Sequence, residues 1–206
     1  MIHPDTELTF ISDDIGYGVV AKKFIPKGTI TWVMDKLDRI FSPQDILGLE
    51  SAYQQILNKY TFRDNAGNYI LCWDHGRFVN HSFRPTCMTT AYNYELAIRD
   101  IYPGDELTND YGTLNLTSPF DCLMEKGCAR KSVMPDDIVR QYPSWDKKLK
   151  SAYKRFNKVD QPMAHLLSEQ VLSMSVEIGK GTVCMDSILS CYCPNLDDGL
   201  FEGCYS

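Results

Sequence analysis

The sequence predicts a mainly β domain over residues 1–122, interrupted by one inserted helix, and an α-helical extension over residues 123–206. Two observations lead to this fold class. Short segments rich in β-branched and aromatic residues alternate with Gly, Pro, Asp and Asn turns in the first 120 residues. After Cys122 the pattern changes to longer segments with apolar residues at helical spacing. A chain of 206 residues, 44% of them hydrophobic, is long enough to bury a core.

Strands are expected where apolar and β-branched residues lie between turn sequences. The expected segments are 7–11, 19–21, 29–33, 60–63, 69–73, 92–98 and 105–108. The fourth and fifth of these form a hairpin, because the five residues Asp-Asn-Ala-Gly-Asn between them make a short loop. The last two are joined through the turn sequence Ile-Tyr-Pro-Gly.

One helix is expected among these strands, over about residues 43–58. Ser42 followed by Pro43 is typical of a helix N-cap and a first helical position. Apolar residues then recur at helical spacing, namely Ile46, Leu49, Tyr53, Ile56 and Leu57.

Three helices are expected in the extension. The first opens at Pro135, the second is capped by Ser144, and the third spans 162–178. The second is basic, with Lys147, Lys148, Lys150, Lys154, Arg155 and Lys158. The third carries one apolar stripe of Met163, Leu166, Leu167, Val171 and Met174. A basic run of this kind is either a solvated helix face or a contact surface for an acidic partner.

The charge of −6 is unevenly distributed. Residues 1–122 hold 10 Lys and Arg against 16 Asp and Glu, whereas residues 123–206 hold 11 of each. The acidic part disfavours nucleic-acid binding, which needs clustered cations, and suits a lysine-rich partner, although it can also serve solubility alone. We expect an intracellular protein, cytoplasmic or nuclear, because no signal-peptide pattern and no membrane-spanning apolar stretch is found.

Three short segments contain residues suited to a binding or catalytic site. The first is Gly16-Tyr17-Gly18, where glycines let a backbone approach a ligand closely. The second, at 77–82, reads Arg-Phe-Val-Asn-His-Ser and offers hydrogen-bonding side chains. The third, at 104–112, ends in Asp-Tyr-Gly, which can present a phenol at a strand end. Each segment alone also has a structural interpretation, as a turn, a satisfied loop or a core aromatic residue.

Together and in this order, the three segments resemble the SET domain of protein-lysine methyltransferases. The chain also has Pro85 after Asn-His-Ser, and the stretch Phe-Ile-Pro-Lys-Gly-Thr-Ile at 24–30 resembles another part of that family. The resemblance covers about residues 7–122. It implies a SET-type β-clip of small sheets with a pseudoknot, in which segments 78–82 and 107–111 pack against each other. Residues 123–206 would then be a post-SET-like segment and a helical extension.

The resemblance also implies an activity, the transfer of a methyl group from S-adenosyl-L-methionine to a lysine ε-amine. Tyr111 takes the position of the catalytic tyrosine. The positions that would bind the methyl donor are Gly16, Tyr17, Gly18, Arg77, Phe78, Asn80 and His81. Thr89 and Asn109 would line the substrate channel. The substrate would be a lysine-containing protein or peptide, such as a histone-like one, bound as an added strand beside the helical insert.

Several residues depart from the family pattern. Many family members have a zinc-binding Cys directly after Asn-His-Ser, where this chain has Phe83. Met124 stands where such members have another zinc-binding Cys. Cys122 and Cys128 alone cannot complete a tetrahedral zinc site, so we expect no metal there. The tail cysteines Cys184, Cys191, Cys193 and Cys204 could form a different site. Asn109 stands where Phe or Tyr is usual, which leaves the number of methyl groups added undetermined.

Two other hypotheses stay open at this point. One is a SET-fold module that binds donor or peptide without transferring a methyl group. The other is an interaction protein organised by zinc through its cysteines and histidines. The sequence does not determine the oligomeric state or the identity of the substrate.

Overall fold

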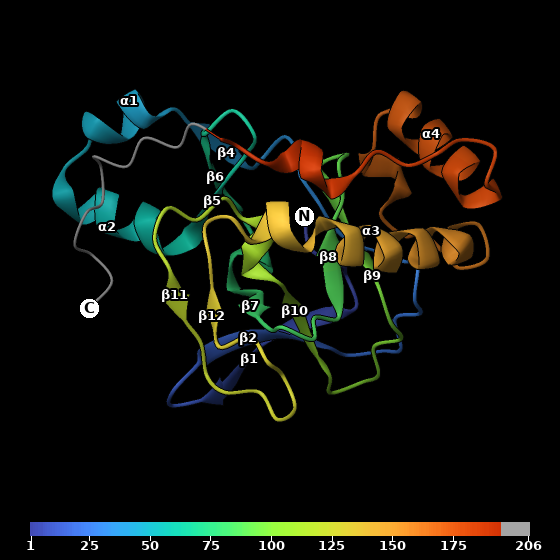
Figure 1. Cartoon of the computed structure of the whole chain (residues 1–206), viewed down its shortest axis with the longest axis horizontal. Coiled ribbons are helices and arrows are strands. Elements are labelled where there is room, and N and C mark those ends of the chain that lie inside the picture. The colour runs from blue at the N-terminus through green and yellow to red at the C-terminus, as the bar shows by residue number, and fades with distance from the viewer. Residues whose placement is uncertain (195–206) are drawn as a thin grey trace.

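A computed structural model describes residues 1–194 of the chain. Strands in small sheets make up the first part, and helices make up most of the last part, which confirms the predicted fold class (Figure 1). Within residues 1–194, no helix is long and apolar enough to span a membrane.

The sheet that positions the site has the strand order β1-β2-β10-β7. These strands are β1 (Thr6–Ser12), β2 (Gly16–Ala21), β10 (Glu106–Asn109) and β7 (Asn80–His81). β10 is antiparallel to β2 and parallel to β7, with Thr108 opposite Asn80 and Asn109 opposite His81. Segments distant in sequence therefore pair as expected, and β7 and β10 lie side by side in the middle of the molecule (Figure 1).

Two three-stranded sheets and one small hairpin complete the β structure. One sheet has the order β3 (Ile30–Val33), β9 (Tyr94–Ala97), β8 (Cys87–Thr89), and the other β4 (Arg39–Phe41), β6 (Tyr69–Leu71), β5 (Thr61–Arg63). The hairpin pairs β11 (Phe120–Asp121) with β12 (Ser132–Val133). The sequence did not predict β4, β7, β8, β11 or β12, because strands of two or three residues are too short to show a periodic pattern.

The predicted single helix over 43–58 is wrong, since the insert consists of α1 (Pro43–Leu47) and α2 (Ser51–Tyr60). The break follows Gly48, a poor helix former, and the Gln54 side chain donates hydrogen bonds to two carbonyls at the break, Ile46 O at 3.1 Å and Leu49 O at 2.9 Å. These bonds satisfy acceptors that a continuous helix would have used.

The first two predicted helices of the extension are in fact one, α3 (Asp137–Phe156). The sequence placed a boundary at Ser144 because serine is a common helix N-cap. Pro143, which lies inside α3, cannot donate a backbone hydrogen bond. The helix continues through Pro143 because its apolar face is buried on both sides of the proline. Burial of Ile138, Trp145 and Leu149 thus offsets the missing bond.

The last helix was predicted to start too early. α4 spans Glu169–Lys180, and its N-cap is Ser168, whose hydroxyl accepts a hydrogen bond from Val171 N at 3.3 Å. The preceding residues form a short 3-10 turn, Ala164–Leu166, followed by an extended residue. Gly181 ends α4 in the left-handed conformation that suits glycine.

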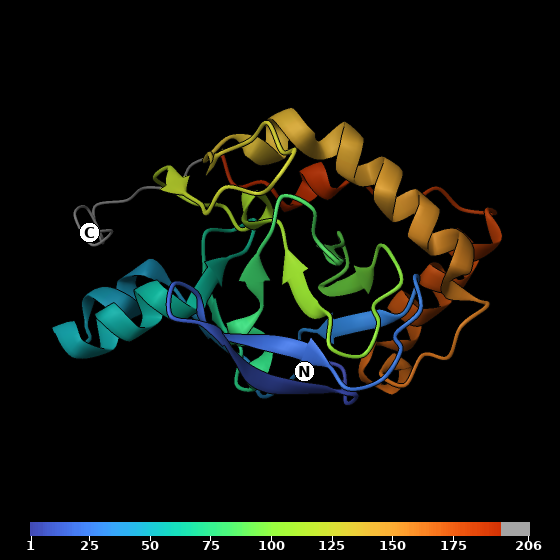
Figure 2. The ribbon, with the colours of Figure 1, turned by 90° about the horizontal axis from the view of Figure 1, so that it is seen from below.

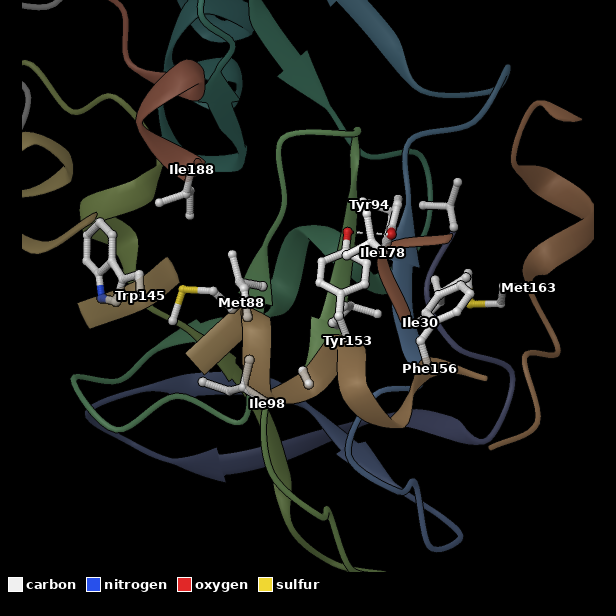
Figure 3. Packing of buried hydrophobic residues seen from close by; sticks show 14 of the residues in the cluster. Ile30, Met88, Tyr94, Ile98, Trp145, Tyr153, Phe156, Met163, Ile178 and Ile188 are labelled. Carbon is white, nitrogen blue, oxygen red and sulfur yellow. Dashed lines mark hydrogen bonds between the residues drawn. The ribbon is translucent and has the colours of Figure 1, made fainter. Parts of the chain in front are cut away.

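The largest core cluster lies between α3 and the β3-β9-β8 sheet (Figure 3). From α3 it includes Trp145, Tyr153 and Phe156, and from the sheet Tyr94 and Leu96, all nearly inaccessible to solvent. The Tyr94 hydroxyl is 2.6 Å from that of Tyr153, so the apolar layer also contains a satisfied polar pair. Figure 2 shows α3 crossing one side of the molecule while β1 and β2 lie on the opposite side. The extension is therefore part of the same core as the sheets.

Candidate functional site

Tyr111 lies at the point where the paired strands β7 and β10 end. It begins a short 3-10 helix, Tyr111–Thr113, directly after β10. Its hydroxyl donates a hydrogen bond to Val79 O at 3.0 Å, and its backbone N–H donates one to His81 Nδ1 at 3.1 Å. The rings of Tyr111 and His81 are 5.3 Å apart. The structure therefore brings the predicted tyrosine and the predicted Asn80-His81 loop together.

Burial raises the pKa of the Tyr111 phenol well above its ordinary value, and the negative charge of Glu106 adds to the effect. The phenol stays protonated at every physiological pH. Tyr111 is consequently a neutral hydrogen-bonding group that cannot act as a base.

Asn80 connects the glycine segment to the same place. Its Nδ2 donates hydrogen bonds to Tyr17 O at 3.0 Å and to Glu106 Oε1 at 2.7 Å. Gly18 permits this approach, because a Cβ at that position would overlap Glu106 Oε1 and lie 2.8 Å from Asn80 Nδ2. Gly16 has φ of 81°, a conformation that favours glycine. All three predicted segments thus converge.

His81 is neutral in this environment, because burial lowers the pKa of its imidazole. Since Nδ1 accepts a hydrogen bond from Tyr111, the ring proton belongs on Nε2. That Nε2 is buried and has no hydrogen-bond partner within residues 1–194. A buried donor without a partner is rare and suits an acceptor atom of a bound molecule.

The side chains of the three remaining predicted donor-site residues, Arg77, Phe78 and Tyr17, lie in different surroundings. Arg77, in the 3-10 turn His75–Phe78, donates a hydrogen bond to Trp73 O at 3.0 Å and lines a pocket. Phe78 packs against a core cluster, and its ring is 5.5 Å from that of Tyr60. Tyr17 is exposed and packs edge-on against Phe10.

A pocket of about 550 Å³ lies next to Tyr111. Tyr111 and Val79 form part of its wall, and aromatic side chains supply much of the rest, including Trp32, Phe62 and Phe120. The Trp32 and Phe62 rings contact each other edge to face at 5.9 Å. Tyr111 therefore connects this pocket with the Asn80-His81 loop.

The predicted channel residues Thr89 and Asn109 both line the pocket, where they share a third residue, Glu95. Asn109 Nδ2 donates hydrogen bonds to Glu95 Oε1 at 2.5 Å and to Thr89 Oγ1 at 2.9 Å. Thr89 Oγ1 also donates to Glu95 Oε1 at 3.3 Å. Burial raises the pKa of the Glu95 carboxyl to about 7, although both hydrogen bonds act in the opposite direction.

Sequence reasoning missed Glu95. The signal was present in the strand Tyr-Glu-Leu-Ala, where one carboxylate alternates with the core residues Tyr94 and Leu96. Alternation shows that Glu95 lies on the opposite face of β9 from those two residues. It could not show that this opposite face is the wall of a pocket.

The C-terminal segment also contributes to the pocket, which the sequence did not indicate. Ser190 and Cys191 line it. Asn115, buried and at φ of 52°, holds this segment in place. Its Nδ2 donates to Cys191 O at 2.8 Å, and its Oδ1 accepts from Cys193 N at 3.0 Å.

Phe83, at the position where a zinc-binding Cys was considered, packs edge-on against His81 with ring centroids 4.4 Å apart. The Arg130 guanidinium lies 4.5 Å from the same Phe83 ring and forms ion pairs of 2.5 Å with Asp110 and Asp137. Within residues 1–194, no group of three or more His, Cys, Asp or Glu side chains is arranged to hold a metal. Cys204 lies outside the described residues.

Comparison with known protein families gives one match. A family model described as the SET domain matches residues 16–112, the range that contains all three convergent segments. Comparison with curated proteins finds none that matches the chain.

Proposed function

We propose, from the premise that residues 16–112 are a SET domain, that the protein transfers a methyl group from S-adenosyl-L-methionine to the ε-amine of a lysine in a protein substrate. SET domains are in general methyltransferase domains. One observation carries the proposal for this chain. Tyr111 contacts the Asn80-His81 loop through its backbone N–H and its ring, and it also lines an aromatic-walled pocket.

The residues of the glycine segment and of the Asn80-His81 loop fit the methyl donor. When bound, S-adenosylmethionine supplies an electrophilic methyl group on a positively charged sulfur. The backbone at Gly16–Gly18 and the residues Asn80 and His81 would hold the donor, and the unpartnered His81 Nε2–H offers a hydrogen bond to an acceptor such as an adenine nitrogen. The Glu106 carboxylate and the carbonyls of Val79 and Tyr17 complement its positive charge.

The residues that line the pocket fit a lysine side chain. Aromatic walls such as Trp32 and Phe62 accommodate its alkyl chain and attract its ammonium by cation–π interaction. Lysine must be neutral to react, although its ordinary pKa is about 10.4. Burial in the pocket beside the positive donor lowers that pKa, because desolvation and like charge both disfavour the ammonium. The substrate peptide would lie as an added strand beside the helical insert, next to this pocket.

Tyr111 orients the reacting groups. Its hydroxyl proton is engaged by Val79 O, so the oxygen lone pairs are available for weak C–H···O contacts to a methyl group. Alignment of two bound reactants can lower a barrier by roughly 7–11 kcal/mol, and the tyrosine and its two neighbouring segments provide that alignment.

The test is methyl transfer from radiolabelled S-adenosylmethionine to a soluble protein extract, followed by mass spectrometry of the labelled residues. We expect methylation at lysine ε-nitrogens. Tyr111→Phe, which removes the Val79 hydrogen bond, should lower the initial rate on the order of 10²-fold. Tyr102→Phe, an exposed tyrosine in the turn before β10, is the matched control and should keep the wild-type rate.

Calorimetry of S-adenosylmethionine binding distinguishes the proposed methyltransferase from the alternative, a SET-fold module that only binds. Binding of S-adenosylmethionine without any methylated product would support a SET-fold binding module. If the protein neither binds S-adenosylmethionine nor forms a methylated product, both assignments are contradicted. The lysines identified would also test the proposed substrate class, a lysine-rich protein such as a histone-like one, attracted by the acidic residues of positions 1–122. We also propose an intracellular location for this reaction.

A further inference from the structure

We propose that Glu95 binds the ammonium of the acceptor lysine in the pocket and takes its proton before methyl transfer. This inference rests on the proposed function and assigns a residue to the deprotonation that the reaction requires.

The position of Glu95 supports the assignment. It lines the same pocket as Tyr111, and its side chain is held from two strands, by Asn109 of β10 and Thr89 of β8. All the hydrogen bonds made by its side chain involve the single atom Oε1. Its other oxygen, Oε2, makes no hydrogen bond within residues 1–194, so it can accept one from an ammonium group.

The charges around Glu95 leave it without a counter-ion. It forms no salt bridge with any residue of the described chain. The titratable groups that interact electrostatically with Glu95 are Tyr111 after β10, Cys72 after β6, Cys87 of β8 and the N-terminal amine. Burial raises the pKa of the phenol and of both thiols, so these three are neutral at pH 7. Only the N-terminal amine is cationic, and its effect on the Glu95 pKa is the smallest of the causes.

Four charged residues also line the pocket: Lys59 from α2, Arg63 from β5, Asp64 from the loop after β5 and Arg77 from the turn before β7. None of them contributes to the shifted pKa of Glu95, which burial raises to about 7. A carboxylate with that pKa is poised to exchange a proton near neutral pH, as a general base requires. An incoming ammonium would be the cation that this buried carboxylate lacks.

The proton balance is complete. An N–H bond of the lysine ammonium breaks and an O–H bond forms on Glu95, which leaves a neutral amine and a neutral carboxylic acid. The amine lone pair then forms the new N–C bond to the methyl group while the C–S bond breaks and its electron pair stays on sulfur. The product is a methylated ammonium, and Glu95 returns its proton to solvent through the open pocket. Tyr111 cannot fill this role, because its phenol stays neutral.

The first test uses n-butylammonium, a mimic of the lysine side chain, and measures its binding to the full chain between pH 6 and pH 8. For the wild type we expect the affinity to increase about tenfold, since Glu95 with a pKa of about 7 becomes ionised over this range. Glu95→Gln should bind more weakly and with no such increase. Asn109→Ala, which removes a hydrogen bond to the carboxylate, should move the inflection above pH 7. Glu7→Gln, exposed on β1, is the control and should behave like the wild type.

The second test measures kcat/KM for a peptide that contains a lysine identified in the extract screen. Glu95→Gln should lower kcat/KM about 10²-fold at pH 7.5, within the usual range for a general base. The deficit should shrink toward pH 10, where the free lysine amine is increasingly neutral without help. Donor affinity, measured by calorimetry, should stay unchanged in the variant.

Two results would overturn the inference while leaving the proposed function intact. One is a deficit of Glu95→Gln that is the same at every pH, which indicates a structural role. The other is wild-type binding of n-butylammonium that does not change between pH 6 and pH 8. A wild-type protein that methylates no lysine would instead contradict the proposed function, and the inference with it.

Discussion

At the residue scale, the pocket beside Tyr111 combines aromatic walls with a small polar group of three side chains, Glu95, Asn109 and Thr89. Two opposed effects set the Glu95 pKa. Burial favours the neutral acid, whereas the two hydrogen bonds favour the carboxylate, and burial is the larger effect. The Glu95 carboxyl is therefore partly protonated at physiological pH. The unfolding free energy should depend on pH as a result.

The unfolding free energy of the wild type should decrease as pH rises through the Glu95 transition. The folded-state pKa of about 7 is above the ordinary 4.5, so the folded protein binds this proton more tightly. The stabilisation is fully present below pH 4.5 and is lost as pH rises through 7. Relative to Glu95→Gln, the wild type should lose about 2–3 kcal/mol between pH 5 and pH 8 in urea unfolding. Parallel pH profiles of the two proteins would contradict this.

At the element scale, Arg130 links three parts of the chain. It lies in the loop before β12, and its guanidinium contacts Asp110 after β10, Asp137 at the start of α3 and the ring of Phe83. Both carboxylates are almost fully buried. This arrangement holds Asp110, the residue directly before Tyr111, in place with an ion triad and an aromatic ring.

Arg130→Met should destabilise the protein by about 3–5 kcal/mol, because it leaves two buried carboxylates without a counter-ion. The matched control is Arg140→Met. Arg140 pairs with Asp136 on the surface of the same region, so its loss should cost about 1 kcal/mol or less. Denaturant unfolding of both variants measures the difference. Equal costs would show that the triad adds nothing beyond a surface ion pair.

The elements also show what the sequence could and could not predict. Seven of the strand segments were predictable, because alternation between turn sequences is a local signal. The convergence of the Gly16–Gly18, Asn80-His81 and Tyr111 segments was predictable only through the resemblance to the SET domain. The break after Gly48 and the continuity of α3 through Pro143 were not. In both cases tertiary contacts outweigh local propensity: Gln54 satisfies the carbonyls at the break, and Trp145 and its neighbours bury the face of α3. Glu95 was missed because pocket walls form only in three dimensions.

At the scale of the whole molecule, the sheets and the helical extension share one core. α3 supplies Leu149, Tyr153 and Phe156 to the cluster that buries Ile30 and Tyr94 (Figure 3). The boundary that we predict after residue 122 separates two regions of different composition, yet the packing across it is continuous. The site residues of the first region therefore depend on the second for a stable framework.

A fragment of residues 1–122 should not fold cooperatively, because it would expose the face of the β3-β9-β8 sheet that α3 covers. Circular dichroism during thermal unfolding measures this. In the full chain, Leu149→Ala should cost about 2–5 kcal/mol, whereas Lys150→Ala, its exposed neighbour on α3, should stay within about 0.5 kcal/mol. A sharp transition in the fragment would contradict the shared core.

The anchoring of residues 190–193 by Asn115 has a consequence for biosynthesis. Every strand of the catalytic framework leaves the ribosome well before the segment that forms the last wall of the pocket. A nascent or prematurely terminated chain that ends before Ser190 would carry Tyr111, Glu95 and the glycine segment, but its pocket would lack that wall. The pocket should accordingly be complete only late in synthesis, so incomplete copies should lack the activity that we propose.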